Sequence, residues 1–160
     1  MTLFSISDRI NRVVEYLLFG MGFAMTMVVA VQVFFRYMLN HSLFWSEELA
    51  RFLLVWLTFL GASSAYYRKA NPGVDFLYEK LSRPLKKLSC ILTHIASMAL
   101  FFVMIFYGCR FAWFVRMQIS PAMQVPKWII MSVIPVSGVI LMIHGAGFFY
   151  AELKKDSHDC

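Results

Sequence analysis

The sequence has few charged residues for its length. Only 15% of its 160 residues are Asp, Glu, Lys or Arg, whereas 60% are hydrophobic. Soluble domains carry roughly 25% charged residues, and they cannot hide several uninterrupted apolar runs of roughly 20 residues. The composition therefore predicts a membrane protein and excludes an ordinary soluble domain.

Motifs of catalysis and of cofactor binding are also lacking. The sequence has no Walker loop, no nucleophile elbow and no discontinuous helix with buried counter-charges. Cys90, Cys109 and Cys160 lie in different segments without a CxxC spacing, which indicates neither a metal site nor a disulfide framework. We therefore predict that the chain is not an enzyme and that it binds no metal and no other cofactor.

The net charge of +6 does not indicate a nucleic-acid-binding protein. Lys and Arg cluster in short stretches between apolar runs, whereas a nucleic-acid site needs them on one solvated face with interleaved aromatic residues. If the amino terminus is cytoplasmic, ten of the fifteen Lys and Arg lie on the cytoplasmic side. The others lie outside, and they are Arg36, Arg51, Arg110, Arg116 and Lys127. This bias predicts a bacterial inner-membrane protein with both termini in the cytoplasm.

Four apolar segments are long enough to cross a bilayer. A helix rises about 1.5 Å per residue and the hydrocarbon core is about 30 Å thick, so roughly 20 residues are needed. No small-residue cleavage site follows the first segment, so we expect it to remain as a membrane anchor. Pro121 and Pro126 separate the last two segments, because proline disfavours continuous helix. The predicted fold is a single all-α membrane domain over residues 1–160, with transmembrane helices at about 13–35, 45–67, 88–113 and 128–150.

The segment between the second and third spans predicts a short amphipathic helix at about residues 74–81. Asn71, Pro72 and Gly73 predict a turn, after which apolar residues recur at helical spacing. We expect this helix to lie on the cytoplasmic leaflet as an interfacial helix. Three basic residues that follow it are predicted to contact anionic lipid headgroups: Arg83, Lys86 and Lys87.

The densest polar group on the outer side lies around the start of the second span. This outer cluster comprises Arg36, Trp45, Glu47, Glu48 and Arg51. Glu47 and Arg51 are four residues apart on one helix, and Arg36 ends the neighbouring span at a similar depth. We therefore predict an interfacial ion-pair network that fixes the hairpin between the first two spans. A catalytic carboxylate pair is not indicated, because adjacent residues project about 100° apart around a helix.

Three ionisable residues leave other functions open. His94 and His144 share a depth in the predicted topology, and two such imidazoles on antiparallel helices can ligate a b-type haem. Interhelical hydrogen bonding is the commoner role of such histidines. Glu15 lies near the cytoplasmic edge of the first span, whereas a proton-coupled multidrug exporter needs its working carboxylate deeper. A b-type cytochrome membrane anchor thus remains the alternative function.

Several segments resemble the small membrane subunit of tripartite ATP-independent periplasmic (TRAP) transporters. The strongest resemblance is the run Trp45-Ser46-Glu47-Glu48-Leu49-Ala50-Arg51 at the start of the second span. It continues in the segments Trp56–Ala62, Val74–Leu77, Ser120–Ala122 and Pro126–Trp128, so that it covers nearly the whole chain. The chain departs from the family at Asn71, where many members have a histidine.

The resemblance implies a scaffold role in a larger transporter. In this family a small subunit joins a large, elevator-type permease subunit, and a periplasmic substrate-binding protein delivers the substrate. A sodium gradient drives the uptake of organic acids such as sialic acid or C4-dicarboxylates, with sodium bound to the large subunit. The resemblance implies that the outer cluster lies near the docking site of the binding protein. For Arg110, Arg116 and Lys127 we expect a contact with lipid phosphates or with the binding protein.

Overall fold

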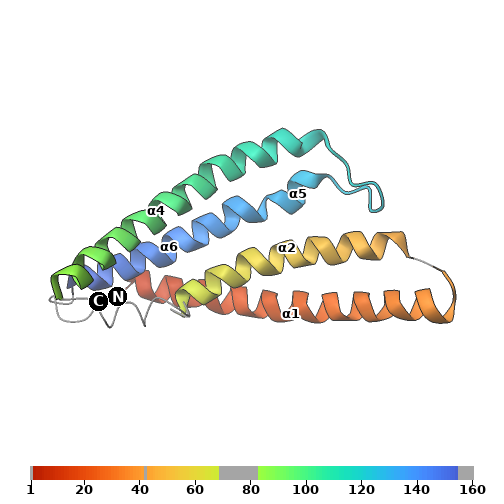
Figure 1. Cartoon of the computed structure of the whole chain (residues 1–160), viewed down its shortest axis with the longest axis horizontal. Helices are drawn as coiled ribbons and strands as arrows, with labels where there is room; N and C mark the ends of the chain where they lie inside the picture. Colours follow the sequence, from red (N-terminus) through yellow and green to blue (C-terminus); the bar gives the residue numbers. More distant parts are fainter. Residues whose placement is uncertain (1, 42, 69–82, 155–160) are drawn as a thin grey trace.

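A computed structural model of the protein describes residues 2–41, 43–68 and 83–154 (Figure 1). Within these ranges the chain forms the helices α1 (Thr2–Met38), α2 (Phe44–Tyr67), α4 (Arg83–Phe114), α5 (Lys127–Met131) and α6 (Val133–Lys154), and the short 3-10 helix η1 (Val115–Met117). Four segments of the described chain are long and apolar enough to cross a membrane: Ser5–Met38, Phe44–Tyr67, Ile91–Met117 and Lys127–Phe149. The prediction of an all-α protein with four transmembrane helices is therefore confirmed. The predicted interfacial helix at 74–81 lies outside the described residues.

The helices pack in a row. α1 packs on α2, α2 packs on α6, and α6 packs on α4, while α1 also contacts α6. Figure 1 shows the helices converging at the end where both termini lie, which we call the termini end, and spreading toward the other end. That other end carries the α1–α2 turn (39–43) and the 118–126 loop between η1 and α5, and we call it the hairpin end.

The buried core is small and lies where three helices meet. Val14 of α1, Leu60 of α2 and Val133 of α6 form its buried apolar centre. Large apolar side chains elsewhere on the helices are exposed, for example Phe19 and Phe102. A bilayer supplies apolar lipid tails against such side chains, whereas a soluble monomer rarely exposes large apolar patches to water. The surface is therefore that of a membrane protein.

Helix α1 begins far before the predicted 13–35 span. Its apolar segment Ser5–Met38 has 34 residues, which span about 50 Å at 1.5 Å per residue and exceed a hydrocarbon core of about 30 Å. Asp8 and Arg12 interrupt the apolar pattern there, but they pair on the exposed side of the helix at 3.6 Å. The first turns stay helical because they carry a buried stripe that packs on the other helices: Ser7, Asn11 and Val14.

The carboxyl end of α1 is capped by its own backbone. Leu39 N and His41 N both donate to the carbonyl oxygen of Phe35 at 3.2 Å. Asn40 adopts a φ of 51°, in the left-handed region that Asn tolerates better than most residues. Arg36, at which we predicted the span to end, therefore lies within the last turn of the helix.

The fourth predicted span, 128–150, is interrupted at Ser132, which separates α5 from α6. Pro135 explains the break, because it has no N–H to donate to the carbonyl four residues earlier and its ring crowds the preceding turn. Helical bonding continues on both sides, from Ser132 N to Trp128 O (2.9 Å) and from Val136 N to Ser132 O (3.2 Å). The sequence prediction missed this break because Pro135 lies within a mostly apolar segment that is long enough to span the membrane as one helix.

Helices α4 and α6 approach each other closely at glycines. A Cβ atom on Gly108 would lie 3.0 Å from Ile134 Cγ2 and 3.0 Å from Pro135 Cδ. A Cβ atom on Gly138 would lie 3.0 Å from Ile105 Cγ1. Small residues allow such approach in membranes, where hydrophobicity gives helices no drive to associate.

Candidate interaction site at the hairpin end

Glu48 joins the α1–α2 hairpin to the 118–126 loop. Its Oε2 atom accepts hydrogen bonds from the backbone N–H groups of Ala122 (3.0 Å) and Met123 (2.9 Å). Hydrogen bonds to an ionised carboxylate are roughly twice as strong as bonds between neutral groups. The amino-terminal part of α2 is therefore fixed to a loop that follows it by more than 70 residues in the sequence.

The loop presents these two N–H groups because of its local fold. Residues 120–124 form a single turn, in which Gln124 N donates to Ser120 O at 3.1 Å. Pro121 occupies the first position of this turn, where its missing N–H is not needed. The next two N–H groups have no acceptor within the turn, as at any helix start. Glu48 supplies the acceptor that the turn itself lacks.

The two sides of the loop are tied to each other. Ile119 and Pro126 form an isolated antiparallel bridge. Lys127 N donates to Gln118 O at 2.9 Å, and Lys127 Nζ donates to Gln118 Oε1 at 3.3 Å. Gln124 turns the chain with a φ of 55°. A loop that is closed by its own hydrogen bonds and held by Glu48 offers a defined surface at the hairpin end.

The structure corrects the predicted ion-pair network of the outer cluster. Glu48 binds backbone N–H groups, and Glu47 Oε1 accepts a hydrogen bond from Gln32 Nε2 of α1 at 3.3 Å. Arg36 and Arg51 are exposed, and across residues 2–41, 43–68 and 83–154 neither lies within 4.0 Å of a carboxylate oxygen. The two carboxylates therefore serve the hairpin and the loop, whereas the two guanidinium groups stay accessible. The docking role of these residues stays a prediction.

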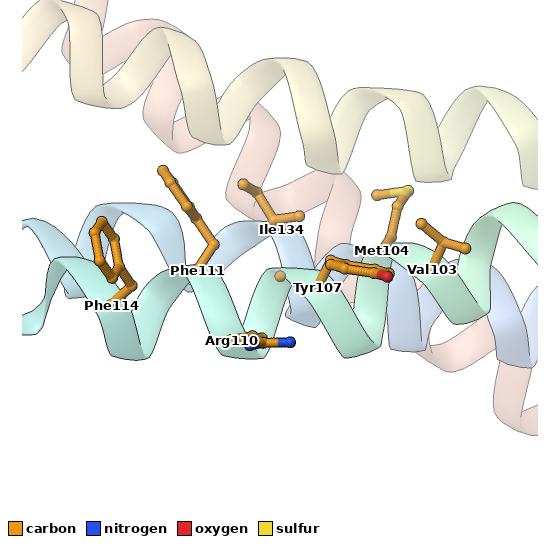
Figure 2. Close-up of a pocket in the computed structure, with 8 residues that line it drawn as sticks. Val103, Met104, Tyr107, Arg110, Phe111, Phe114 and Ile134 are labelled. Carbon is orange, nitrogen blue, oxygen red and sulfur yellow. The ribbon is translucent and has the colours of Figure 1, made fainter.

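The three other outer cations have different surroundings. The guanidinium carbon of Arg116 lies 3.9 Å from the centroid of the Trp113 ring, which is a cation–π contact. Lys127 is hydrogen-bonded to Gln118 within the loop. Arg110 borders an apolar groove on α4, which Figure 2 shows. The lipid or binding-protein contact of these cations stays a prediction, and of the three it is Arg110 that lines this groove.

The remaining predicted residues lie at both ends of the bundle. Arg83, Lys86 and Lys87 belong to the first turns of α4, at the termini end, and their side chains lie outside the described residues. Their contact with headgroups therefore stays a prediction. Trp45 lies in the first turn of α2, at the hairpin end, and is 44% exposed.

A polar cluster at the termini end was not predicted. Glu15 Oε1 accepts hydrogen bonds from Arg68 Nη2 (2.7 Å), Arg68 Nε (3.0 Å) and Asn11 Nδ2 (2.7 Å). Tyr67 OH donates to Asp8 Oδ1 at 3.1 Å. These bonds tie α1 to the end of α2, and they give Glu15, which we placed near the cytoplasmic edge of the first span, a partner from another helix. The sequence contains an indication of these contacts. In an antiparallel hairpin, Tyr67 and Arg68 at the end of the second span lie at the same depth as Asp8 and Glu15 near the start of the first span.

The two histidines face different neighbours. His144 is 1% exposed, its Nδ1 atom is hydrogen-bonded to Ser7 Oγ, and its ring lies 5.0 Å from the ring of Tyr67. The His94 ring instead lies 6.2 Å from the ring of Phe149. Interhelical hydrogen bonding is thus what the structure shows for His144. None of these contacts supports the alternative of a haem anchor.

A protein-family model matches most of the chain. Residues 25–155 match the family described as "Tripartite ATP-independent periplasmic transporters, DctQ component". The matched range includes the carboxyl-terminal part of α1 and all of α2, α4, α5 and α6. It therefore contains the outer cluster, the 118–126 loop and the groove on α4.

Curated relatives carry names from the same family. The chain is 31% identical over 100 residues to the C4-dicarboxylate TRAP transporter small permease protein DctQ of Vibrio cholerae, over 62% of this chain and 42% of that protein. It is 31% identical over 84 residues to the sialic acid TRAP transporter small permease protein SiaQ of the same organism, over 52% of this chain and 48% of that protein. It is 26% identical over 133 residues to the isethionate TRAP transporter permease protein DctMQ of Oleidesulfovibrio alaskensis, over 76% of this chain and 20% of that protein.

The chain spans between 20% and 48% of the length of these relatives. The family match itself covers well over half of this chain. The resemblance that rested on the run Trp45–Arg51 is thereby confirmed. The chain belongs to the DctQ-component family of tripartite ATP-independent periplasmic transporters, as an integral membrane protein with four transmembrane helices.

Proposed function

We propose that this chain is the small permease subunit of a binding-protein-dependent importer, in which it forms a fixed scaffold for a large elevator-type permease subunit. The observation that carries the proposal is the match to DctMQ, which covers 76% of this chain but only 20% of that permease protein. In that relative, a segment similar to this chain is joined to a much longer permease segment. We infer the same partnership here.

The exposed apolar faces of the helices support a large partner within the membrane. Helix α1 exposes many large apolar side chains, among them Phe19 (78%), Phe23 (58%) and Phe34 (56%). A row of helices has two broad faces, so one face can bind the partner while the other contacts lipid. A scaffold that is four helices wide fits this arrangement.

The polar contacts support a scaffold rather than an ion pathway. Glu15 of α1 is paired with Arg68, and Glu48 of α2 is bound to the 118–126 loop. Carboxylates that drive transport must be free to release and rebind an ion or a proton, and these two are held by other groups. Sodium therefore binds the large subunit in this proposal, and the chain itself needs no cofactor and catalyses no reaction.

The distribution of Lys and Arg supports a defined orientation in the bacterial inner membrane. In the sequence, ten of the fifteen Lys and Arg lie in the terminal segments and in the segment between the second and third spans, and this bias supports a cytoplasmic location of both termini. The hairpin end then faces the periplasm. In this orientation Arg36, Arg51 and the 118–126 loop lie where a periplasmic substrate-binding protein would dock.

The substrate is an organic acid in this proposal. The three relatives are named for isethionate, a C4-dicarboxylate and sialic acid, and each of these compounds carries an acidic group. Their identities to this chain differ little, so similarity favours none of the three. The choice among organic acids therefore rests with the large subunit and the binding protein.

Reconstitution tests the proposal. The large permease that co-purifies with this chain is placed in proteoliposomes with and without the chain, together with its binding protein and a sodium gradient. Uptake of isethionate, succinate and sialic acid is measured. We expect uptake of one of these acids only when both membrane subunits are present. Full uptake by the large subunit without this chain would refute the scaffold role, and uptake by this chain alone would show that it is itself a transporter.

A further inference from the structure

An apolar groove of about 520 Å³ lies on the half of α4 that is nearer the hairpin end (Figure 2). Its volume falls within the range of about 300–1,000 Å³ that is typical of pockets for small molecules. Figure 2 shows Phe111 and Phe114 at one end, Val103 and Met104 at the other, and Ile134 of α6 between them. Gly108 also lines the groove, where its missing side chain lets Ile134 pack closely against α4.

Arg110 and Tyr107 bring polar groups to the edge of this groove. Arg110 is exposed and has no carboxylate within 4.0 Å in the described ranges. It differs in this from Arg116, whose guanidinium lies on the Trp113 ring. Tyr107 precedes Arg110 by three residues on the helix, so the two are neighbours on its surface, and Tyr107 is 60% exposed. The groove is thus lined by apolar side chains, and a cation without an acidic partner in the described ranges and an accessible hydroxyl group lie at its edge.

The groove is aligned with the direction of a lipid chain. Arg110 lies four residues before the end of α4 at Phe114, which is about 6 Å along the helix axis. A side chain as long as that of Arg reaches the headgroup layer from this depth. Val103 lies seven residues before Arg110, or about 10 Å nearer the middle of the bilayer. The groove therefore runs from the headgroup layer toward the membrane centre.

We infer that this groove binds an anionic phospholipid, with the phosphate held by Arg110 and one acyl chain lying along Phe111, Ile134 and Val103. Charge complementarity selects this occupant. A phosphate accepts two parallel hydrogen bonds from a guanidinium group, whereas an apolar helix of a partner would leave the guanidinium unpaired within the membrane. The inference goes beyond the proposed function and does not depend on it.

Native mass spectrometry of the protein, purified in mild detergent with any subunits that accompany it, tests the headgroup contact. Phosphatidylglycerol and phosphatidylcholine with the same acyl chains are added at equal concentrations. We expect the protein to retain phosphatidylglycerol preferentially, and Arg110→Gln to lower its occupancy about tenfold, because a charge-assisted contact is lost. The matched control Arg9→Gln leaves the occupancy unchanged, because this exposed arginine lies near the start of α1, at the termini end, and does not line the groove. Equal retention of both lipids, or no effect of Arg110→Gln, overturns the inference.

Two further variants test the apolar part of the groove. Ile134→Trp fills the groove and keeps Arg110, so it lowers the retention of phosphatidylglycerol to that of phosphatidylcholine in protein that remains monodisperse and helical. If this variant does not fold, Phe111→p-benzoylphenylalanine gives an independent test in whole membranes. After illumination we expect the mass of the protein to increase by one phospholipid. Capture of a polypeptide instead would show that the groove is a protein interface and would overturn the inference.

Discussion

The two ends of the bundle hold their helices together in different ways. At the termini end, side chains of opposite charge meet, because Glu15 of α1 pairs with Arg68 after α2. At the hairpin end, Glu48 binds two backbone N–H groups, and Arg36 and Arg51 have no acidic partner within the described chain. The carboxylates at both ends are thus bound, but Glu15 is bound by side chains at the termini end, whereas Glu48 is bound by backbone N–H groups at the hairpin end.

The reason lies in the backbone near each carboxylate. Within a helix, the backbone N–H groups are hydrogen-bonded to carbonyl groups of the same helix. Glu15 therefore accepts hydrogen bonds from side chains. At the hairpin end the chain turns at residues 120–124, and this turn leaves N–H groups without an acceptor. Glu48 takes these groups and leaves the arginines to other partners. The comparison indicates that side chains join two helices at the termini end, whereas at the hairpin end a carboxylate joins a helix to the backbone of a loop.

The largest effect is expected at the termini end, from Ser7→Ala. This change removes the hydrogen-bond partner of His144 Nδ1 and leaves a buried polar atom unsatisfied. We expect the free energy of unfolding in mixed micelles to fall by about 1–3 kcal/mol. The exposed residue two positions earlier gives the matched control, because Ser5→Ala should change the value by less than about 0.5 kcal/mol. Equal effects of both variants would show that this hydrogen bond does not hold the termini end together.

Charge reversal at the termini end should have the next largest effect. Arg68→Glu places two acidic side chains together, so we expect a lower melting temperature, with a smaller loss than that of Ser7→Ala. The loss should shrink at high salt, because the pair is largely exposed and ions screen it. Combining Arg68→Glu with Glu15→Arg should restore most of the loss. If the exchanged pair melts no higher than Arg68→Glu alone, the ion pair is not what joins α1 to α2.

At the hairpin end, Glu48→Ala should act locally. The N–H groups of Ala122 and Met123 lose their acceptor, so we expect their hydrogen exchange to become about tenfold faster while the rest of the bundle changes little. Glu48→Gln should have an intermediate effect, because its amide oxygen still accepts hydrogen bonds but carries no charge. The matched control is Glu47→Ala, whose side chain contacts α1 instead. Faster exchange across all four helices would contradict the comparison of the two ends.

The smallest effect is expected from Gln32→Ala. This residue donates to Glu47 through an exposed contact of 3.3 Å, so its loss should change the free energy of unfolding by less than about 0.5 kcal/mol. Denaturant titration beside the Ser7→Ala variant measures the difference. A loss as large as that of Ser7→Ala would mean that the stability of the bundle depends on the hairpin end as much as on the termini end.

Much of the fold was predictable because the length and hydrophobicity of a segment indicate whether it spans a membrane. Four apolar segments predicted four transmembrane helices, and the structure has four such helices. Boundaries were less predictable. The start of α1 was missed because Asp8 and Arg12 interrupt the apolar run, although both lie on the exposed side of a continuous helix. The break at Ser132 was missed because the apolar residues around Pro135 predict one continuous membrane-spanning helix.

The candidate site was only partly predictable, because its contacts join distant parts of the chain. The sequence singled out Glu48 and Arg51 through local charge density and predicted that they belong to ion pairs. The actual acceptor role of Glu48 depends on the turn at 120–124, which lies beyond another helix. Arg51 was expected to pair with Glu47, but Glu47 instead accepts a hydrogen bond from Gln32 of α1, which no pattern near residue 51 could have shown.

The sequence by itself determined that this protein lies in a membrane, how many spans it has and to which family it belongs. These properties depend on local features, namely hydropathy, basic residues between spans and the run Trp45–Arg51. The tertiary structure alone decided which polar groups meet. Arg68 lies 53 residues from Glu15, and Ala122 lies 74 residues from Glu48. Such pairs depend on how the helices are placed side by side, and that placement follows from close packing at small residues and buried stripes along the whole bundle.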